Sequence, residues 1–272
     1  MSTEKTALVT GATDGIGHET ARVLAGLGYR VLVHGRTLEK ASRACEALGA
    51  GVPVAADLSD LAAVRGLAAA VRGETSRLDV LVNNAGVFVH DHALTGDGIE
   101  LTMAVNHFAP LVLTHELVPL LEATPGARVV HVSSVAHQRG RVDLSNVDLS
   151  KDIQNFEGYA AYATSKLANV LFSNAMARRT RATHNALHPG VISTKLLKTG
   201  FGASGASVAE GARTSVKVAT DPELATATGR YFAAGREARV SAAAADAELS
   251  ERFYELSTLR AGVRALPPTR GS

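Results

Sequence analysis

The sequence predicts an α/β fold, a doubly wound parallel sheet of about seven strands with helices on both faces, in a single domain over residues 1–272. Short apolar runs alternate with longer helical patterns from the N-terminus onward, which is the rhythm of βαβ units. These runs lack polar alternation, as expected for strands buried on both faces. The chain is 46% hydrophobic and no Pro- or Ser-rich linker divides it, so one large core is expected.

The expected elements follow one another in order. Strands are expected at 6–10, 30–34, 52–56, 78–84, 127–134, 182–190 and 229–233. Helices are expected at 15–27, 38–48, 61–71, around 98–122 and over about 159–180. The Gly/Ser/Ala-rich stretch 198–207 lies within a segment, about 192–212, that we expect to form a mobile loop over the substrate.

Composition narrows the class of protein. The formal net charge is +2 and no basic stripe with interleaved aromatic residues is present, so nucleic acid is not expected as a partner. The stretch MSTEKTALVTG lacks the apolar run of a signal peptide or membrane span, so we expect a cytoplasmic protein without a membrane partner. The single cysteine, Cys45, excludes an internal disulfide and any cysteine-based metal cluster.

The turn after the first expected strand is rich in glycine. It reads TGATDGIG over 10–17, and Gly11, Gly15 and Gly17 would let the backbone approach a phosphate at a helix N-terminus. In a Rossmann-like sheet, ligands bind beyond the carboxyl ends of the strands, where this turn lies. Tight βα turns also use glycine for purely structural reasons. The residues of this turn that we expect to bind a dinucleotide are Gly11, Thr13, Asp14, Gly15, Ile16 and Gly17.

The end of the second expected strand favours NADP(H) over NAD(H). A cofactor with a free ribose 2′-hydroxyl usually meets an acidic residue about 20 residues beyond the glycines. Gly35 stands at that place and Arg36 follows, and a guanidinium can pair with a 2′-phosphate. Against this, Arg36 could be a surface charge, and Asp14 adds negative charge near the phosphates. Asp57, beside Leu58, could accept a hydrogen bond from adenine or cap the next helix.

Polar residues follow the fourth and fifth expected strands at the same sheet edge. The fourth is followed by NNAG, from which Asn83, Ala85 and Gly86 are expected at the cofactor, although Asn and Gly are also ordinary turn residues. The fifth ends in two serines, the second of which is Ser134, and serines there often cap the next element.

The stretch YAAYATSK, 159–166, begins a helix and holds two tyrosines. Residues four apart share a helix face, so Tyr162 lies beside Lys166, whereas Tyr159 faces Ala163. A nearby cation favours the phenolate, and a pKa lowered by about three units would make Tyr162 a proton donor and acceptor near neutrality. A lone Y-x-x-x-K is frequent by chance, but the whole ordered set of motifs is not.

These motifs together resemble the short-chain dehydrogenase/reductase family along essentially the whole chain. The matching motifs are TGATDGIG, Asp57-Leu58, Asn83-Asn84-Ala85-Gly86, Asn106, Ser134, Tyr162 to Lys166 and His188-Pro189-Gly190. VNHFAPLVLT, SSVAH and YATSKLANVLF are similar to the retinol-dehydrogenase-like branch. The alanine-rich composition indicates a soluble bacterial relative rather than a membrane-anchored one.

The resemblance implies a role for each matching residue. Tyr162 would be the general acid in carbonyl reduction and the general base in alcohol oxidation. Lys166 would lower the pKa of Tyr162 and bind the nicotinamide ribose, and Ser134 would orient the substrate oxygen. Asn106 would hold a water in the proton relay, or would simply mark a helix kink. Thr194 would contact the nicotinamide carboxamide.

The resemblance also places Pro189 and Gly190 at the cofactor and implies a homodimer or homotetramer. The predicted reaction is NADP(H)-dependent interconversion of a carbonyl and an alcohol on a small molecule. Two alternatives stay open: epimerisation through transient oxidation with retained cofactor, and a dinucleotide sensor without catalysis. His90, Asp91 and His92 could suggest a metal site, but we interpret them as a polar loop and expect no metal.

Overall fold

The computed structural model describes residues 4–154 and 156–269. Its sheet has eight strands in the order β3-β2-β1-β4-β5-β6-β7-β8. The strands are β1 (Thr6–Val9), β2 (Arg30–Gly35), β3 (Val52–Ala55), β4 (Val80–Asn83), β5 (Arg128–Val132), β6 (Thr183–His188), β7 (Arg230–Ala233) and β8 (Arg236–Glu237). The first seven pair in parallel and confirm the predicted doubly wound sheet. The additional strand, β8, is two exposed residues that pair antiparallel with β7.

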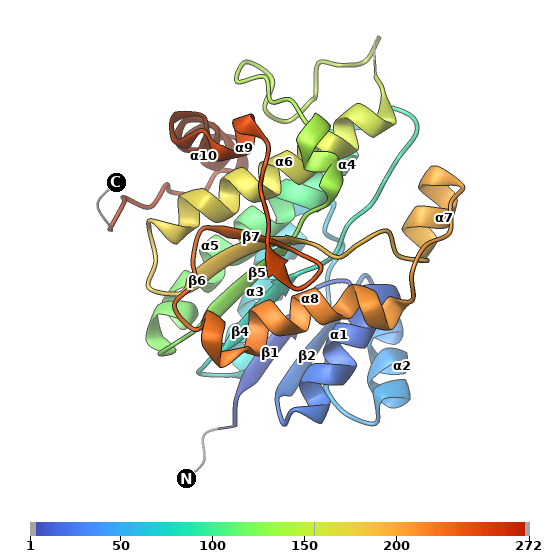
Figure 1. Cartoon of the computed structure of the whole chain (residues 1–272), viewed down its shortest axis with the longest axis vertical. Coiled ribbons are helices and arrows are strands. Elements are labelled where there is room, and N and C mark those ends of the chain that lie inside the picture. The colour runs from blue at the N-terminus through green and yellow to red at the C-terminus, as the bar shows by residue number, and fades with distance from the viewer. Residues whose placement is uncertain (1–3, 155, 270–272) are drawn as a thin grey trace.

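Helices cover both faces of this sheet (Figure 1). The longer ones are α1 (Gly15–Gly26), α2 (Leu38–Leu48), α3 (Leu61–Glu74), α5 (Ala109–Ala123), α6 (Gly158–Ala177), α8 (Val208–Thr220) and α10 (Ala247–Ala261). The short ones are α4 (Leu101–Met103), the π-helix η1 (Ala104–Phe108), the 3-10 helices η2 (Val135–Arg139) and η3 (Pro222–Leu224), α7 (Lys195–Phe201) and α9 (Ala242–Ala245). Helices α1, α2 and α8 lie on one face, and α3, α5 and α6 lie on the other.

Strand alternation divides the core into two layers. On β1, the fully buried Leu8 packs with α3, α5 and α6, whereas Ala7 and Val9 pack on the opposite face with α1 and α8. Successive side chains on a strand point to opposite faces, so an apolar run supplies both layers at once. Because the first seven strands run parallel, their carboxyl ends meet at one edge of the sheet, between these two layers.

The helix predicted over 98–122 is interrupted by the π-helix η1, which contains Asn106. Pro110 explains where the interruption falls. An α-helix needs the N–H of residue 110 to reach the carbonyl of Asn106, and proline has no N–H to donate. π-turns inside helices are often found at functional sites.

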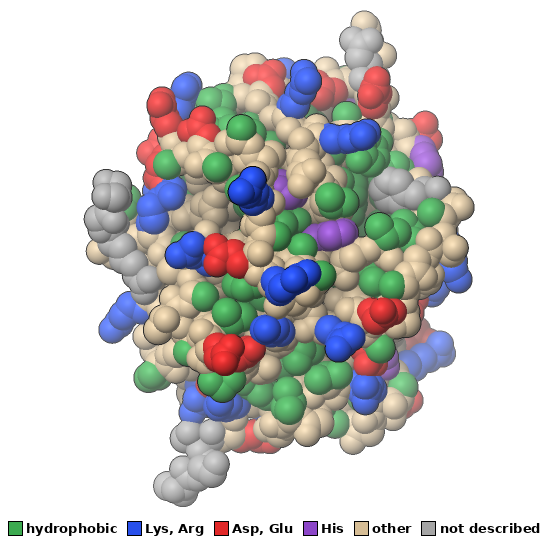
Figure 2. Space-filling view, viewed as in Figure 1, with side chains coloured by type: hydrophobic (Ala, Val, Ile, Leu, Met, Phe, Trp, Pro, Cys, Tyr) green, Lys and Arg blue, Asp and Glu red, His purple; other side chains and the backbone are tan. Residues whose placement is uncertain are grey.

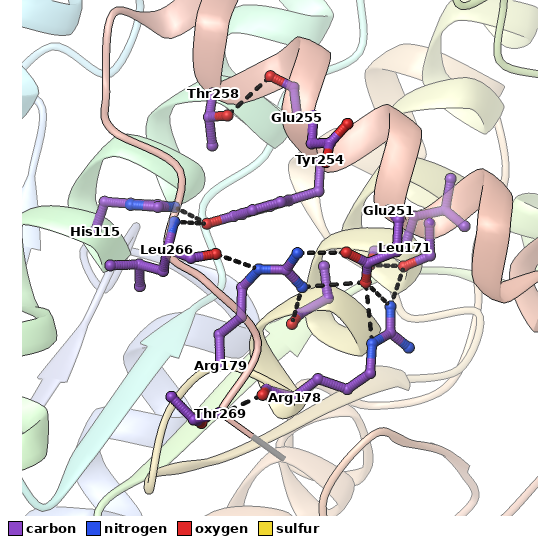
Figure 3. A network of polar contacts seen from close by, with 12 residues as sticks. His115, Leu171, Arg178, Arg179, Glu251, Tyr254, Glu255, Thr258, Leu266 and Thr269 are labelled. Atoms are coloured by element: carbon purple, nitrogen blue, oxygen red, sulfur yellow. Dashed lines mark hydrogen bonds and ion pairs between the residues drawn. The ribbon is translucent and has the colours of Figure 1, made fainter. Parts of the chain in front are cut away.

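The C-terminal helix α10 packs along α6, and a polar network fastens the segment that follows it (Figure 3). The buried Arg179 guanidinium contacts the Glu251 carboxylate, donates to the Leu266 carbonyl at 2.8 Å and lies 4.2 Å from the centre of the Tyr254 ring. The Tyr254 hydroxyl contacts His115 Nε2 at 3.2 Å and accepts from Leu266 N at 2.9 Å. The stretch that contains Leu266 is thereby held against α5 and the C-terminal end of α6.

On the face shown in Figure 2, basic and acidic side chains are interspersed, and neither sign gathers over one element. None of the helices within 4–154 and 156–269 combines the length and apolar character that crossing a membrane requires.

Candidate active site

A cavity of about 710 Å³ lies beyond the carboxyl ends of the parallel strands. Its size falls in the range of small-molecule and cofactor sites. Of the predicted site residues, all but Asn83 and Asn106 line it: Gly11, Thr13, Asp14, Gly15, Ile16, Gly17, Arg36, Asp57, Leu58, Ala85, Gly86, Ser134, Tyr162, Lys166, Pro189, Gly190 and Thr194. Residues far apart in the sequence are therefore brought to one place by the topology of the sheet.

The glycine turn is packed too closely to admit side chains. Gly11 has φ +62°, and a Cβ there would stand 2.9 Å from the Ala85 backbone. A Cβ on Gly17 would stand 2.3 Å from the carbonyl oxygen of Gly11 and 2.4 Å from the Asn84 amide nitrogen. That amide donates to the Thr10 carbonyl at 2.8 Å and joins the turns after β1 and β4. The glycines thus allow the turn to pack against the chain after β4 while it lines the cavity at the N-terminus of α1.

A buried histidine, His34, hydrogen-bonds the backbone of the glycine turn. Gly11 N donates to His34 Nδ1 at 3.1 Å, so His34 Nε2 carries the proton and donates to the Ala56 carbonyl at 3.1 Å. Burial lowers the pKa of His34 to about 4, which keeps the imidazole neutral. The ring therefore links the end of β2 to the first turn.

The far end of the cavity is lined by Arg36, Lys40 and Asp57. Arg36 Nε lies 3.9 Å from Asp57 Oδ2, and both side chains are largely exposed. The other Asp57 oxygen accepts from the Ser59 backbone at 2.9 Å, and these hydrogen bonds hold the pKa of the carboxyl below its usual value. Gly35 leaves no room for a side chain, because a Cβ there would lie 2.6 Å from Thr13 Cγ2.

Tyr162, Ser134 and Lys166 meet at the opposite end. The Tyr162 side chain is 8% exposed and is hydrogen-bonded to the Ser134 side chain. Lys166 Nζ lies 5.4 Å from the centre of the Tyr162 ring and donates to the Val132 carbonyl at 3.1 Å. The neighbouring Ser133 instead donates to the Lys166 carbonyl at 2.7 Å and ties β5 to α6.

The pKa of Tyr162 is shifted opposite to the direction predicted from the Tyr–Lys spacing. Burial raises it to about 12, although the hydrogen bond with Ser134 works in the other direction. Burial also lowers the pKa of Lys166 to about 8. The ammonium faces the ring and the Val132 carbonyl, so desolvation outweighs its attraction for a phenolate.

Asn106 lies just behind this group, with its amide bound to protein. Its oxygen accepts from Val87 N at 2.7 Å, and its nitrogen donates to the Val87 carbonyl and to Ser165 Oγ, each at 3.0 Å. Ser165 in turn donates to the Tyr162 carbonyl at 2.7 Å. Asn106 therefore connects the chain after β4 to the first turns of α6.

The segment after β6 closes the cavity. Thr194 caps α7, and the next residue, Lys195, forms a salt bridge of 2.9 Å with Asp14 of the glycine turn. The predicted substrate loop, about 192–212, is not without regular structure: it contains α7 and the start of α8, and a bridge joins Ile192 to Ala206. The predicted mobility of this loop stays a prediction.

A family model described as short chain dehydrogenase matches residues 5–204. The chain belongs to the short chain dehydrogenase family. It is an oxidoreductase of that family with a Rossmann-like fold.

Individual relatives agree with this assignment. The chain is 36% identical to retinol dehydrogenase 12 of Bos taurus, over 96% of this chain and 87% of that protein. Among solved structures, an uncharacterized protein from Mycobacterium paratuberculosis is 31% identical with a TM-score of 0.82, covering 97% of this chain and 95% of that one. A short chain dehydrogenase from Escherichia coli CFT073, complexed with NADPH, is 26% identical with a TM-score of 0.67, covering 85% and 97%.

Some residues of this family member's cavity were not predicted from the sequence. Asn84 lines the cavity, whereas Asn83 points away and donates to Thr114 Oγ1 on α5 at 3.1 Å. Lys40 joins Arg36 at the far end. Lys40 lies in the first turn of α2, whereas Arg36 precedes the N-cap Thr37, so helical spacing does not relate the two residues.

The two histidines of the loop after β4 contact different parts of the chain. His90 Nε2 lies 3.4 Å from the Thr199 carbonyl, and His92 Nε2 lies 3.1 Å from the Leu149 carbonyl. Within the described part of the chain, no group of three or more His, Cys, Asp or Glu side chains is arranged to hold a metal ion.

Proposed function

We propose that this dehydrogenase is an NADP(H)-dependent enzyme that interconverts a carbonyl and an alcohol, with Tyr162 as the acid and base. The observation that carries the proposal is the hydrogen bond between Tyr162 and Ser134 in the cavity that also contains the glycine turn. A phenol held there can give its proton to a carbonyl oxygen while a hydroxyl donor orients that oxygen.

The cavity fits a dinucleotide. Gly11 and Gly17 let the turn pack closely against Ala85 and Asn84, and the N-terminus of α1, which this turn brings to the cavity, favours the negative charge of a diphosphate. When bound, NADP(H) supplies or accepts the hydride at the substrate carbon. The residues that would hold it are those of the glycine turn, Asp57, Leu58, Ala85 and Gly86, with Pro189, Gly190, Thr194 and Lys166 toward the nicotinamide.

Charge at the far end of the cavity supports NADP(H) rather than NAD(H). Arg36 and Lys40 supply two cations against the single carboxylate of Asp57. Gly35 cannot be replaced by an acidic residue without a clash with Thr13. The negative charge of Asp14, which would oppose a further phosphate, is paired with Lys195 at 2.9 Å. A 2′-phosphate would therefore meet net positive charge.

The protein's own groups perform the proton step. In reduction, Tyr162 Oη–H gives its proton to the carbonyl oxygen, which Ser134 orients, and the Lys166 ammonium beside the ring stabilises the phenolate that remains. The Asn106 amide is engaged by Val87 and Ser165, so a relay water would be held by the Asn106 carbonyl, which Pro110 leaves without an α-helical donor.

The substrate we propose is an apolar alcohol or aldehyde. Val135, Tyr159 and Val191 line the cavity and are 47%, 41% and 54% exposed, so apolar surface is presented at its mouth. Several relatives are named retinol dehydrogenases, which is consistent with an apolar substrate.

The test is NADPH consumption over a panel of aldehydes and ketones, with Tyr162→Phe against the matched control Tyr159→Phe. Tyr162→Phe should lower kcat by about 10²- to 10⁴-fold, the usual contribution of a general acid, and leave NADPH affinity unchanged. Equal effects in the two variants, or tight NADPH binding without reduction of any carbonyl, would refute the reductase.

The cofactor preference has a separate test. Arg36→Ala should reduce the ratio of NADP to NAD affinity by about tenfold or more, because a charge-assisted hydrogen bond contributes ~1.5–3 kcal/mol. An unchanged ratio would show that Arg36 does not recognise a 2′-phosphate.

A further inference from the structure

His137 is a fully buried imidazole one turn after Ser134 that is not used in the proton step. It lies in η2, between the end of β5 and the loop that leads to α6. On the opposite side of its ring, Ser241 begins the short helix α9. The imidazole therefore stands between the proposed substrate-orienting serine and the C-terminal part of the chain.

Its hydrogen bonds define one tautomer. Ser241 N–H can only donate, and it points at His137 Nε2 at 3.3 Å, so Nε2 must be the acceptor. The proton then lies on Nδ1, which donates to the Ser134 carbonyl at 2.7 Å. Burial lowers the pKa of His137, so the ring is neutral and this tautomer is retained near neutral pH.

The Ser134 carbonyl is therefore held twice by one residue, since His137 N also donates to it at 3.1 Å. The Ser134 hydroxyl accepts from Ala136 N at 3.2 Å, so its own proton can be directed toward the cavity. Together these bonds fix the backbone and the side chain of Ser134 beside Tyr162.

We propose that His137 is a positioning residue for Ser134: it transmits the position of the segment at Ser241 to the Ser134 backbone and so sets the Ser134 hydroxyl against Tyr162. The proposal rests on the proposed reductase function. In this proposal, the backbone N–H of Ser241, in the C-terminal part of the chain, helps to hold the serine that binds the substrate oxygen.

A purely structural role makes the opposite prediction for two substitutions. The His137 ring packs on Tyr231 with a centroid distance of 4.7 Å, so a packing role is best preserved by His137→Phe. His137→Asn loses that packing but keeps an N–H near the position of Nδ1. If His137 positions Ser134, the Phe variant should lose about 10- to 100-fold in kcat, as small misplacements near reacting groups do, and the Asn variant should recover most of it. The KM for NADPH should stay unchanged.

Ser241 provides a matched pair of variants. Ser241→Pro replaces the N–H with the ring Cδ, which stands where the hydrogen now points at His137 Nε2, so it removes the donor and displaces the imidazole, whereas Ser241→Ala keeps the N–H. Both lose the side-chain bond that caps α9. Only Ser241→Pro should lower kcat, and the melting temperatures of all variants serve as the check on folding.

The tautomer can be read without turnover, by ¹⁵N NMR of the His137 ring. We expect a protonated Nδ1 in the parent and a mixture of tautomers in Ser241→Pro. A protonated Nε2 in an active parent, or full activity in His137→Phe, would overturn the positioning role alone. An inactive parent with the expected tautomer would refute the reductase function and, with it, a role for His137 in that reaction.

Discussion

Acidification should unfold this protein because four of its histidines are neutral in the folded chain: three of them are buried and the fourth, His115, is partly buried. In the folded chain, burial lowers the pKa of His34 and His115 to about 4 and that of His107 and His131 to about 3, against an ordinary value of 6.5. Above pH 6.5 neither the folded nor the unfolded chain protonates them, and their contribution to stability is fully present. Below pH 6.5 these histidines are protonated in the unfolded chain but not in the folded chain, so the free energy of unfolding decreases as the pH falls toward about 4.

The size of the stability loss follows from the pH difference between 6.5 and the pH of the measurement. Each histidine costs ~1.4 kcal/mol for every pH unit below 6.5, so at pH 5 each costs ~2 kcal/mol and the four together about 8 kcal/mol. Single domains have a total stability of roughly 5–15 kcal/mol, so this loss is enough to unfold many of them. Cooperative unfolding is therefore expected near pH 5.

The assay is urea unfolding followed by far-ultraviolet circular dichroism from pH 7.5 to 5, since the chain has no tryptophan. His115→Gln should recover about 2 kcal/mol of the loss between pH 7 and pH 5, because the amide oxygen can still accept from Tyr254 while one titrating group is removed (Figure 3). His90→Gln, at an exposed histidine, is the matched control and should recover none. A free energy of unfolding that changes by less than about 1 kcal/mol over this pH range would refute the reasoning.

Further predictions concern the site and one helix. The rate of alcohol oxidation should rise with pH, because Tyr162, with its pKa raised to about 12, must first lose its proton. The rate of carbonyl reduction should fall above about pH 8, because Lys166 then loses its charge. Initial rates measured in both directions test these two expectations. Gly17→Ala should weaken NADPH binding by about tenfold or more in a fluorescence titration, because overpacking costs ~1–3 kcal/mol. Gly66→Ala, inside α3 with open space around it, should instead stabilise the fold by about 1 kcal/mol in urea unfolding and leave NADPH binding unchanged.

The sheet could be predicted because each parallel strand is a buried apolar run, and that pattern is visible in one sequence. The eighth strand could not, because Arg236 and Glu237 are polar and exposed and become a strand only by pairing with β7. The π-turn at Asn106 could be predicted only in part. Apolar periodicity continues through it, but Pro110 carries the signal that an α-helical hydrogen bond is missing there.

Prediction of the site depended on whether its geometry is local. Helical periodicity alone selects Tyr162 over Tyr159, because the distance to Lys166 is set within one helix. The choice between Asn83 and Asn84 depends on where β4 ends and which face its last residue takes. That is decided by packing against Thr114, which no local pattern records.

The pKa of Tyr162 shows most clearly what spacing leaves undetermined. Four residues of helix bring the Lys166 ammonium to the ring, but the Val132 carbonyl, on another element, determines where that ammonium points. Both groups are then buried, and burial favours the neutral form of each, so the phenol pKa rises while the ammonium pKa falls. A tyrosine that keeps its proton at neutral pH is suited to donate it. The proposed enzyme is accordingly better prepared for carbonyl reduction than for alcohol oxidation, and Ser134, positioned through His137, would present the oxygen that receives the proton.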